Sequence, residues 1–247
     1  MINLDDVASE FFPNSETYLE NDLMMHWYPA RIVDRFGFCD RLLELGIGHG
    51  HTVKTFAAAC NKYTVVEGSK VVIDQFCNRH PEFKGEIVYD LFEKYDEKDK
   101  FDVIVMGFVL EHVDDPRFLL CRYIDKLKEG GKLYIVVPNA KSLNRRLGLE
   151  LGMIDDIYSL NKNDIALGHQ RQFCRKTLSD LIFQCGLKII HEEGIYLKPL
   201  PLGILKTLPE FEKNLQAMLK IGVDFPDLCV GILVEAVVFD KDKVEVP

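Results

Sequence analysis

The sequence predicts an α/β fold built on a doubly wound, mostly parallel seven-stranded sheet with an antiparallel last strand. Apolar runs alternate with helical patterns between residues 41 and 138, which favours parallel strands buried on both faces. Right-handed crossovers then place helices on both sides of the sheet. Two β-rich runs near the C-terminus, Leu187–Ile195 and Val230–Phe239, are expected to pair antiparallel at its edge.

The N-terminal elements follow from local patterns. Residues 1–36 are expected to be helical and partly irregular. The first strand is predicted at Arg41–Leu45, and a helix follows the glycines after it. Tyr63–Glu67 is a short strand, and Ser69 is expected to cap a helix that runs to about Asn78.

The next elements continue this alternation. Gly85–Tyr89 and the strongly apolar Phe101–Gly107 are predicted to be the third and fourth strands. A helix is expected from about Pro116 to Lys128, ended by the two glycines at 130 and 131. Lys132–Pro138 is then the fifth strand.

The last third of the chain has a different pattern. A helix is predicted at Thr177–Cys185, closed by Gly186, and another at Glu210–Ile221. The segment before this second helix, residues 197–209, is rich in proline and leucine. We expect this insertion to pack over the strand ends as part of a substrate lid.

Charge, hydropathy and cysteine usage exclude several classes of protein. The net charge of −9 argues against broad nucleic-acid binding, which normally shows a basic surface stripe. Apolar runs are shorter than the roughly 18 residues that span a bilayer, and the first residues do not resemble a signal peptide. Seven scattered cysteines without a C-x-x-C pair indicate reduced thiols and a cytoplasmic protein.

The most informative local feature is the loop after the first strand. Glu44 lies one residue before the end of the strand, and Gly46, Gly48 and Gly50 alternate through the turn that follows. Glycine lets a ligand lie directly against the main chain. The dinucleotide fingerprint G-x-G-x-x-G needs its third glycine where His51 stands, so the loop matches that pattern poorly. A plain strand-to-helix turn remains the simplest alternative.

Three motifs carry a resemblance to a known family. The E-x-G-x-G-x-G pattern resembles motif I of class I S-adenosylmethionine-dependent methyltransferases. Residues 108–116, FVLEHVDDP, resemble the L-E-H-V-x-D-P signature of the subgroup that includes ubiquinone-biosynthesis O-methyltransferases and sugar methyltransferases. Residues 168–173, followed by Thr177-Leu178, resemble that subgroup's H-x-x-x-F…T-L element. The resemblance implies a Rossmann-like fold and methyl transfer.

The same resemblance implies a set of cofactor contacts. Glu44 would face the methionine amino group, and Glu67, an acid at a strand end, would accept the ribose hydroxyls. Asp90 would bind the adenine amino group while the Leu91 amide meets the ring. The complete cofactor set that we expect is Glu44, Gly46, Gly48, Gly50, Glu67, Gly68, Asp90, Leu91, Gly107 and Phe108.

Candidate catalytic and substrate residues follow from chemistry and placement. His112 and His169 are the candidate bases, because imidazole titrates near neutral pH. Tyr18, Tyr28, Arg145 and Arg171 are candidate substrate contacts, with the arginines either binding an anionic acceptor or forming a solvated basic face. Phe108 replaces the first glutamate of the E-x-x-E-H metal pattern found in some relatives, so we expect no required metal.

The sequence thus predicts one domain, residues 1–247, that moves a methyl group from S-adenosylmethionine to an oxygen or nitrogen of a small metabolite. An anionic acceptor, and a sugar- or nucleotide-linked one, are among the options. Alternatives are an NAD-type oxidoreductase and a cofactor-binding protein without turnover. We expect no nucleic-acid or membrane partner and leave a homodimer open. The expected parts are an N-terminal helical lid at 1–36, a cofactor-binding core at 37–140, and substrate or lid segments at 141–185 and 197–227.

Overall fold

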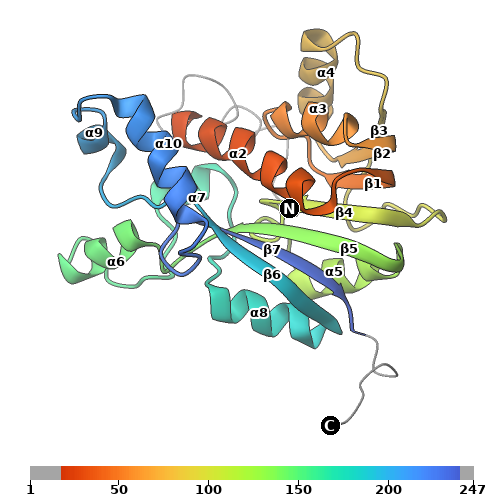
Figure 1. The fold of residues 1–247 in the computed structure, drawn as a ribbon. Helices are drawn as coiled ribbons and strands as arrows, with labels where there is room; N and C mark the ends of the chain where they lie inside the picture. The colour runs from red at the N-terminus through yellow and green to blue at the C-terminus, as the bar shows by residue number, and fades with distance from the viewer. Residues whose placement is uncertain (1–17, 240–247) are drawn as a thin grey trace.

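A single sheet organises the computed structural model, which describes residues 18–239 (Figure 1). Its spatial order is β3-β2-β1-β4-β5-β7-β6, and β7 runs antiparallel to both of its neighbours. The strands are β1 (Cys39–Leu45), β2 (Cys60–Glu67), β3 (Glu86–Tyr89), β4 (Phe101–Gly107), β5 (Leu127–Pro138), β6 (Leu187–Ile195) and β7 (Gly231–Val238). The predicted doubly wound sheet and its antiparallel last strand are therefore confirmed.

Helices cover both faces of this sheet. They are α2 (Tyr18–Phe36), α3 (His51–Ala57), α4 (Lys70–Arg79), α5 (Pro116–Ile124), α6 (Leu143–Glu150), α7 (Lys162–Ala166), α8 (Arg175–Gln184), α9 (Leu202–Leu205) and α10 (Phe211–Gly222). One hydrophobic core joins α2, α3, α4 and α10 to the sheet, and a second joins α5 and α8 to the opposite face. Successive strand residues alternate between the cores, so Leu42 lies in the first and Leu43 in the second.

Most predicted boundaries agree with the structure to within two residues, and some agree in mechanism. Ser69 caps α4, where its Oγ accepts a hydrogen bond of 3.2 Å from the Val72 amide. Gly186 follows α8 with a positive φ of 77°. The predicted C-terminal pair is confirmed as β6 and β7, with β6 at the sheet edge.

The prediction for the segment after α5 was wrong. The helix ends at Ile124, and β5 begins at Leu127 and passes through both glycines instead of starting at Lys132. A Cβ on Gly131 would lie 2.9 Å from the Lys128 carbonyl oxygen, and the pairing with β4 shifts register here. The glycines therefore mark an irregularity within a strand, not the end of a helix.

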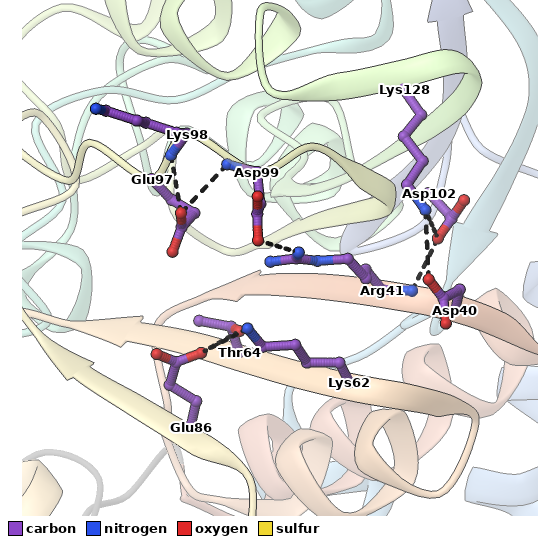
Figure 2. Close-up of polar contacts among 10 residues, drawn as sticks. All are labelled: Asp40, Arg41, Lys62, Thr64, Glu86, Glu97, Lys98, Asp99, Asp102 and Lys128. Carbon is purple, nitrogen blue, oxygen red and sulfur yellow. Dashed lines mark hydrogen bonds and ion pairs between the residues drawn. The ribbon is translucent and has the colours of Figure 1, made fainter.

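The two ends of the sheet carry different kinds of side chain. At the amino-terminal ends of β1, β2 and β4, charged residues form surface contacts (Figure 2). Arg41 pairs with Asp99, its amide donates to the Asp102 carboxylate, and Lys128 lies 2.9 Å from the same carboxylate. These contacts lie far along the strands from the glycine loop, which follows the carboxyl end of β1.

Two further expectations, on the cysteines and on membrane-spanning helices, can be compared with the described residues. The cysteines are free thiols, as the sequence predicted. Among residues 18–239, no helix has the length and apolar character needed to cross a membrane. The division into lid, core and substrate segments stays a prediction, although Figure 1 shows α6, α9 and α10 grouped on the side of the molecule away from α4.

Candidate active site

A cavity of about 710 Å³ opens at the carboxyl ends of the parallel strands. Gly46 lines it after β1, Glu67 at the end of β2, Gly107 at the end of β4, and Pro138 at the end of β5. In sheets of this kind, ligands bind at this edge, where the strand order reverses. The strand order places β1 and β4 side by side at the centre, so the glycine loop lies at that reversal.

The glycine loop presents bare main chain to the cavity. Gly48 has a φ of +50°, and a Cβ added there would meet no protein atom within 4 Å. A side chain at this position would therefore occupy cavity space that a ligand can use. Gly50 differs: it does not line the cavity, and its added Cβ would lie 2.8 Å from the Phe76 ring. Gly50 thus packs α3 against α4, and its expected cofactor contact stays a prediction.

Glu67 is held in place by the main chain. Its two carboxylate oxygens accept hydrogen bonds of 3.0 Å from the Ile47 amide and 2.8 Å from the Ser69 amide. A carboxylate oxygen can accept more than one hydrogen bond, so both oxygens keep capacity for ligand hydroxyls. Gly68 lines the cavity beside it. This geometry fits the predicted ribose contact.

Glu44 is a buried acid on the cavity wall. It is 2% exposed and accepts a hydrogen bond from the Tyr63 hydroxyl. Burial raises the pKa of its carboxyl to about 8. A cationic ligand group beside Glu44 would lower that pKa and offset the cost of burying the charge.

Only one of the two residues expected to contact the adenine lines the cavity. Leu91, Phe92 and Glu93 line the cavity, but Asp90 does not. The Asp90 carboxylate instead accepts a hydrogen bond of 2.8 Å from the Leu91 amide. The two groups assigned to the adenine therefore bind each other. Phe92 is an aromatic wall residue that the sequence analysis missed, although its place one residue after Leu91 was a usable signal.

Tyr28 and Phe108 close the cavity from either side of Gly107. The Tyr28 hydroxyl lies where a Cβ on Gly107 would stand, so only glycine fits there. The Tyr28 and Phe108 rings meet edge to face with centroids 5.8 Å apart, and both residues line the cavity. Tyr18 begins α2, but its side chain lies outside the described part of the chain, so its predicted role is open.

His112 and His169 come together although 57 positions separate them. Their ring centroids are 4.8 Å apart, and both residues line the cavity. Burial and the neighbouring His169 lower the pKa of His112 to about 3, which makes its imidazole a poor proton acceptor at neutral pH.

Glu111 is a cavity residue that the sequence analysis assigned no catalytic or binding role. It is fully buried, and neither carboxylate oxygen has a hydrogen-bond partner among the described residues. Burial raises the pKa of this carboxyl to about 7. Ligand atoms of Glu111, His112 and His169 lie within 4.8 Å of one another, so His169 adds a third ligand atom to the Glu111-His112 pair of the motif. The expectation of no required metal stays a prediction.

A second residue that the sequence analysis missed, Asp164, lies beside His169. His169 Nδ1 lies 3.5 Å from Asp164 Oδ1, while Arg145 Nη1 lies 3.7 Å from Asp164 Oδ2. Burial acts to raise the pKa of Asp164, but His169, the Asn161 amide and Arg145 lower it overall. Asp164 is therefore an ionised partner for His169, as in other carboxylate–histidine pairs.

The two candidate arginines are committed to protein groups. Arg171 does not line the cavity, and its guanidinium donates to the main-chain carbonyls of residues 110, 113 and 114. Arg171 thus braces the loop after β4, and its expected substrate contact stays a prediction. Arg145 does line the cavity, but it donates to the Ile157 and Ser159 carbonyls in addition to its pairing with Asp164.

The fold and this strand-end cavity are those of a class I S-adenosylmethionine-dependent methyltransferase. The methyltransferase domain model matches residues 13–192, and the chain belongs to this family. This family match confirms the predicted enzyme class and cofactor, and it disfavours the NAD-type alternative.

Individual relatives are more distant. Over 116 residues, 45% of this chain, the sequence is 28% identical to the mitochondrial ubiquinone biosynthesis O-methyltransferase of Schizosaccharomyces pombe. The chain spans 42% of the length of that relative. This relative belongs to the subgroup whose signature the L-E-H-V motif resembles.

Solved structures share the fold at low identity. One is the Burkholderia thailandensis 1,6-didemethyltoxoflavin-N1-methyltransferase with bound 1,6-didemethyltoxoflavin and S-adenosylhomocysteine (TM-score 0.63, 16% identity, 95% of this chain and 86% of that chain). Another is the N-methyltransferase NodS from Bradyrhizobium japonicum WM9 with S-adenosylhomocysteine (TM-score 0.56, 13% identity, 94% and 98%).

Proposed function

We propose that this domain transfers a methyl group from S-adenosylmethionine to a hydroxyl or amine of a small acceptor that is neutral or cationic. The charged side chains that line the cavity are the evidence for the charge of the acceptor. Two cationic side chains among the described lining residues, Arg145 and Lys198, face eight acidic ones. The acids are Glu20, Glu44, Glu67, Glu93, Glu111, Asp114, Asp115 and Asp164.

Both cationic side chains already have acidic partners. Lys198 Nζ lies 2.7 Å from a Glu20 carboxylate oxygen, and Arg145 pairs with Asp164. Burial raises the pKa of two of the lining acids, Glu44 and Glu111, so they contribute less negative charge than the others. Among the described lining residues an anionic acceptor would still meet acidic side chains without an unpaired cation, which costs electrostatic energy. The charge pattern therefore argues against the anionic and nucleotide-linked acceptors considered from the sequence, while a sugar hydroxyl or an amine remains compatible.

The residues present fit the cofactor. When bound, S-adenosylmethionine supplies a methyl group on a sulfonium that an in-line nucleophile can displace. The bare main chain at Gly48 offers room for it, Glu67 presents oriented oxygens for the ribose, and Glu44 offers a carboxyl to the amino group. Leu91 and Phe92 supply an apolar wall for a ring.

The chain's own groups then handle the acceptor. We assign His169 as the base that takes the acceptor proton, because Asp164 can stabilise the imidazolium that forms. Glu111 has two buried oxygens without described partners, so it can accept a hydrogen bond from a hydroxyl or ammonium group of the acceptor. Tyr28 and Phe108 exclude water and hold the acceptor in line, and such positioning is worth up to about 7–11 kcal/mol in favourable cases.

An acceptor panel sorted by charge tests this function. The protein is incubated with methyl-labelled S-adenosylmethionine and matched amines, sugars, carboxylates and nucleotides, and labelled product is counted. We expect turnover with members of the first two groups. Glu111→Gln should raise the acceptor KM and leave S-adenosylhomocysteine binding unchanged. Turnover confined to carboxylates or nucleotides would contradict the proposed acceptor class.

A further inference from the structure

A second cluster of metal-ligating side chains lies where α2 meets the glycine loop. Asp22 and His26 stand one helical turn apart on α2, while His49 and His51 flank Gly50. His51 Nε2 lies 2.8 Å from Asp22 Oδ1, and His26 Nε2 lies 3.8 Å from Asp22 Oδ2. The cluster is separate from the Glu111, His112 and His169 group.

The geometry brings these ligand atoms close enough for one ion. One ligand atom each from Asp22, His49 and His51 lies within 4.8 Å of the other two. Ligands about 2.0–2.2 Å from a tetrahedral ion stand about 3.4 Å apart, so modest side-chain rotation closes the difference. The His26 ring is 3.8 Å from the His51 ring, centroid to centroid, and its Nε2 lies 3.8 Å from Asp22, which places a further imidazole beside two of the three ligands.

An ion pair alone accounts for only part of this cluster. Three imidazoles gather around a single carboxylate, and charging all of them would place like charges within a few ångströms of one another. Unprotonated imidazoles present ring nitrogens with lone pairs, the form in which histidine binds metals.

We propose that Asp22, His49 and His51 bind a divalent transition-metal ion of the zinc or cobalt type, with His26 available as a fourth ligand. Imidazole nitrogens with one carboxylate oxygen suit such ions. Magnesium and calcium prefer sets made almost entirely of oxygen, which this cluster lacks.

Occupancy of this site couples two walls of the cavity. Met24 and Tyr28 of α2 line the cavity on one side, and Gly48 and His49 of the loop line it on another. An ion bound by Asp22, His49 and His51 cross-links α2 to the glycine loop and to the first residue of α3. Metal binding therefore stabilises the folded protein and slows the exchange of any ligand that must pass between these walls.

The test uses the full chain, freed of metal with a chelator and titrated with Co²⁺ while its visible absorption is followed, with Zn²⁺ as competitor. We expect the wild type to bind about one equivalent at this cluster. His51→Gln and Asp22→Asn should each weaken it at least about tenfold, because loss of even an outer-shell partner costs about 10–100-fold. His80→Gln, outside the cluster at the end of α4, is the matched control.

The second histidine group needs its own control. His112→Gln reports any Co²⁺ bound at Glu111, His112 and His169, so the two sites are separated by which variant loses the signal. Thermal midpoints without metal show whether each variant is folded. Of the two site variants, we expect Asp22→Asn, on the helix surface, to disturb folding less than His51→Gln. The proposal is overturned if the wild type takes up no Co²⁺ or Zn²⁺, or if only His112→Gln loses binding.

Discussion

At the scale of single residues, the cavity is defined by buried acids. Glu44 and Glu111 are both nearly inaccessible to solvent, and burial raises the pKa of each carboxyl. Sequence position alone predicted Glu44 at the strand end. The burial of Glu111 could not be predicted, because it depends on the contacts of the loop after β4, which Arg171 braces from a distant segment.

Glu44 should make stability depend on pH. Its pKa is about 8 in the folded chain and about 4.5 when unfolded. The folded state therefore holds a proton that the unfolded state has lost, so this contribution to stability falls as pH rises from about 4.5 to 8. The difference in unfolding free energy between Glu44→Gln and the wild type, measured by urea denaturation, should thus shift in the variant's favour over that window. A pH-independent difference would contradict this assignment.

His169 should carry the proton transfer. His169→Asn is expected to lower kcat by about 10²–10⁴-fold, the usual contribution of a general base. His112→Asn should lower it less, because burial gives His112 a pKa of about 3. Asp164→Asn should act through His169 and shift the kcat–pH profile. Equal losses in the two histidine variants, with an unchanged profile in Asp164→Asn, would show that the roles are assigned incorrectly.

At the scale of elements, the glycine loop separates binding from packing. Motif resemblance treated its three glycines alike. The structure distinguishes Gly48, whose Cβ would enter open cavity, from Gly50, whose Cβ would strike Phe76. That distinction depends on how α4 packs, a contact between residues far apart in sequence.

Two alanine variants test this separation directly. Gly50→Ala should destabilise the protein by about 1–2 kcal/mol from the positive φ alone, and further through the contact with Phe76. Gly48→Ala has a similar backbone cost but should also weaken S-adenosylhomocysteine binding. Thermal unfolding and calorimetry measure the two effects. Equal loss of affinity in both variants, after correction for folding, would refute the distinction.

The strands show where sequence patterns suffice. The bounds of β4 were predicted as they stand, because a continuous apolar run between polar segments has one interpretation. The start of β5 was missed because two glycines after a helical pattern usually signal a helix end. Only the pairing of Phe101 with Leu127 across the sheet reveals the strand there.

At the scale of the whole molecule, the ligand cavity and a group of surface ion contacts lie at opposite ends of the sheet. The ligand cavity lies at the carboxyl ends of the strands, and the ion contacts of Arg41, Asp99, Asp102 and Lys128 lie at the amino ends (Figure 2). The composition predicted an acidic protein. It could not predict that acidic side chains outnumber cationic ones in the cavity, and this excess is the reason for proposing a neutral or cationic acceptor.

The amino-terminal ion contacts should be dispensable for binding. Asp99 is largely exposed, and exposed ion pairs contribute about 0–1 kcal/mol. Asp99→Asn should therefore leave cofactor affinity unchanged and alter the thermal midpoint slightly. A marked loss of S-adenosylhomocysteine binding in this variant would mean that the two ends of the sheet are coupled.

We expect the strand-end cavity to bind S-adenosylmethionine through Glu67 and the glycine loop. Calorimetric titration of the purified protein with S-adenosylhomocysteine, and separately with NAD, tests it most directly, with Glu67→Gln as the site variant. We expect the wild type to bind one equivalent of S-adenosylhomocysteine, Glu67→Gln to bind it more weakly, and NAD to produce no heat. Binding of NAD in place of S-adenosylhomocysteine would contradict it.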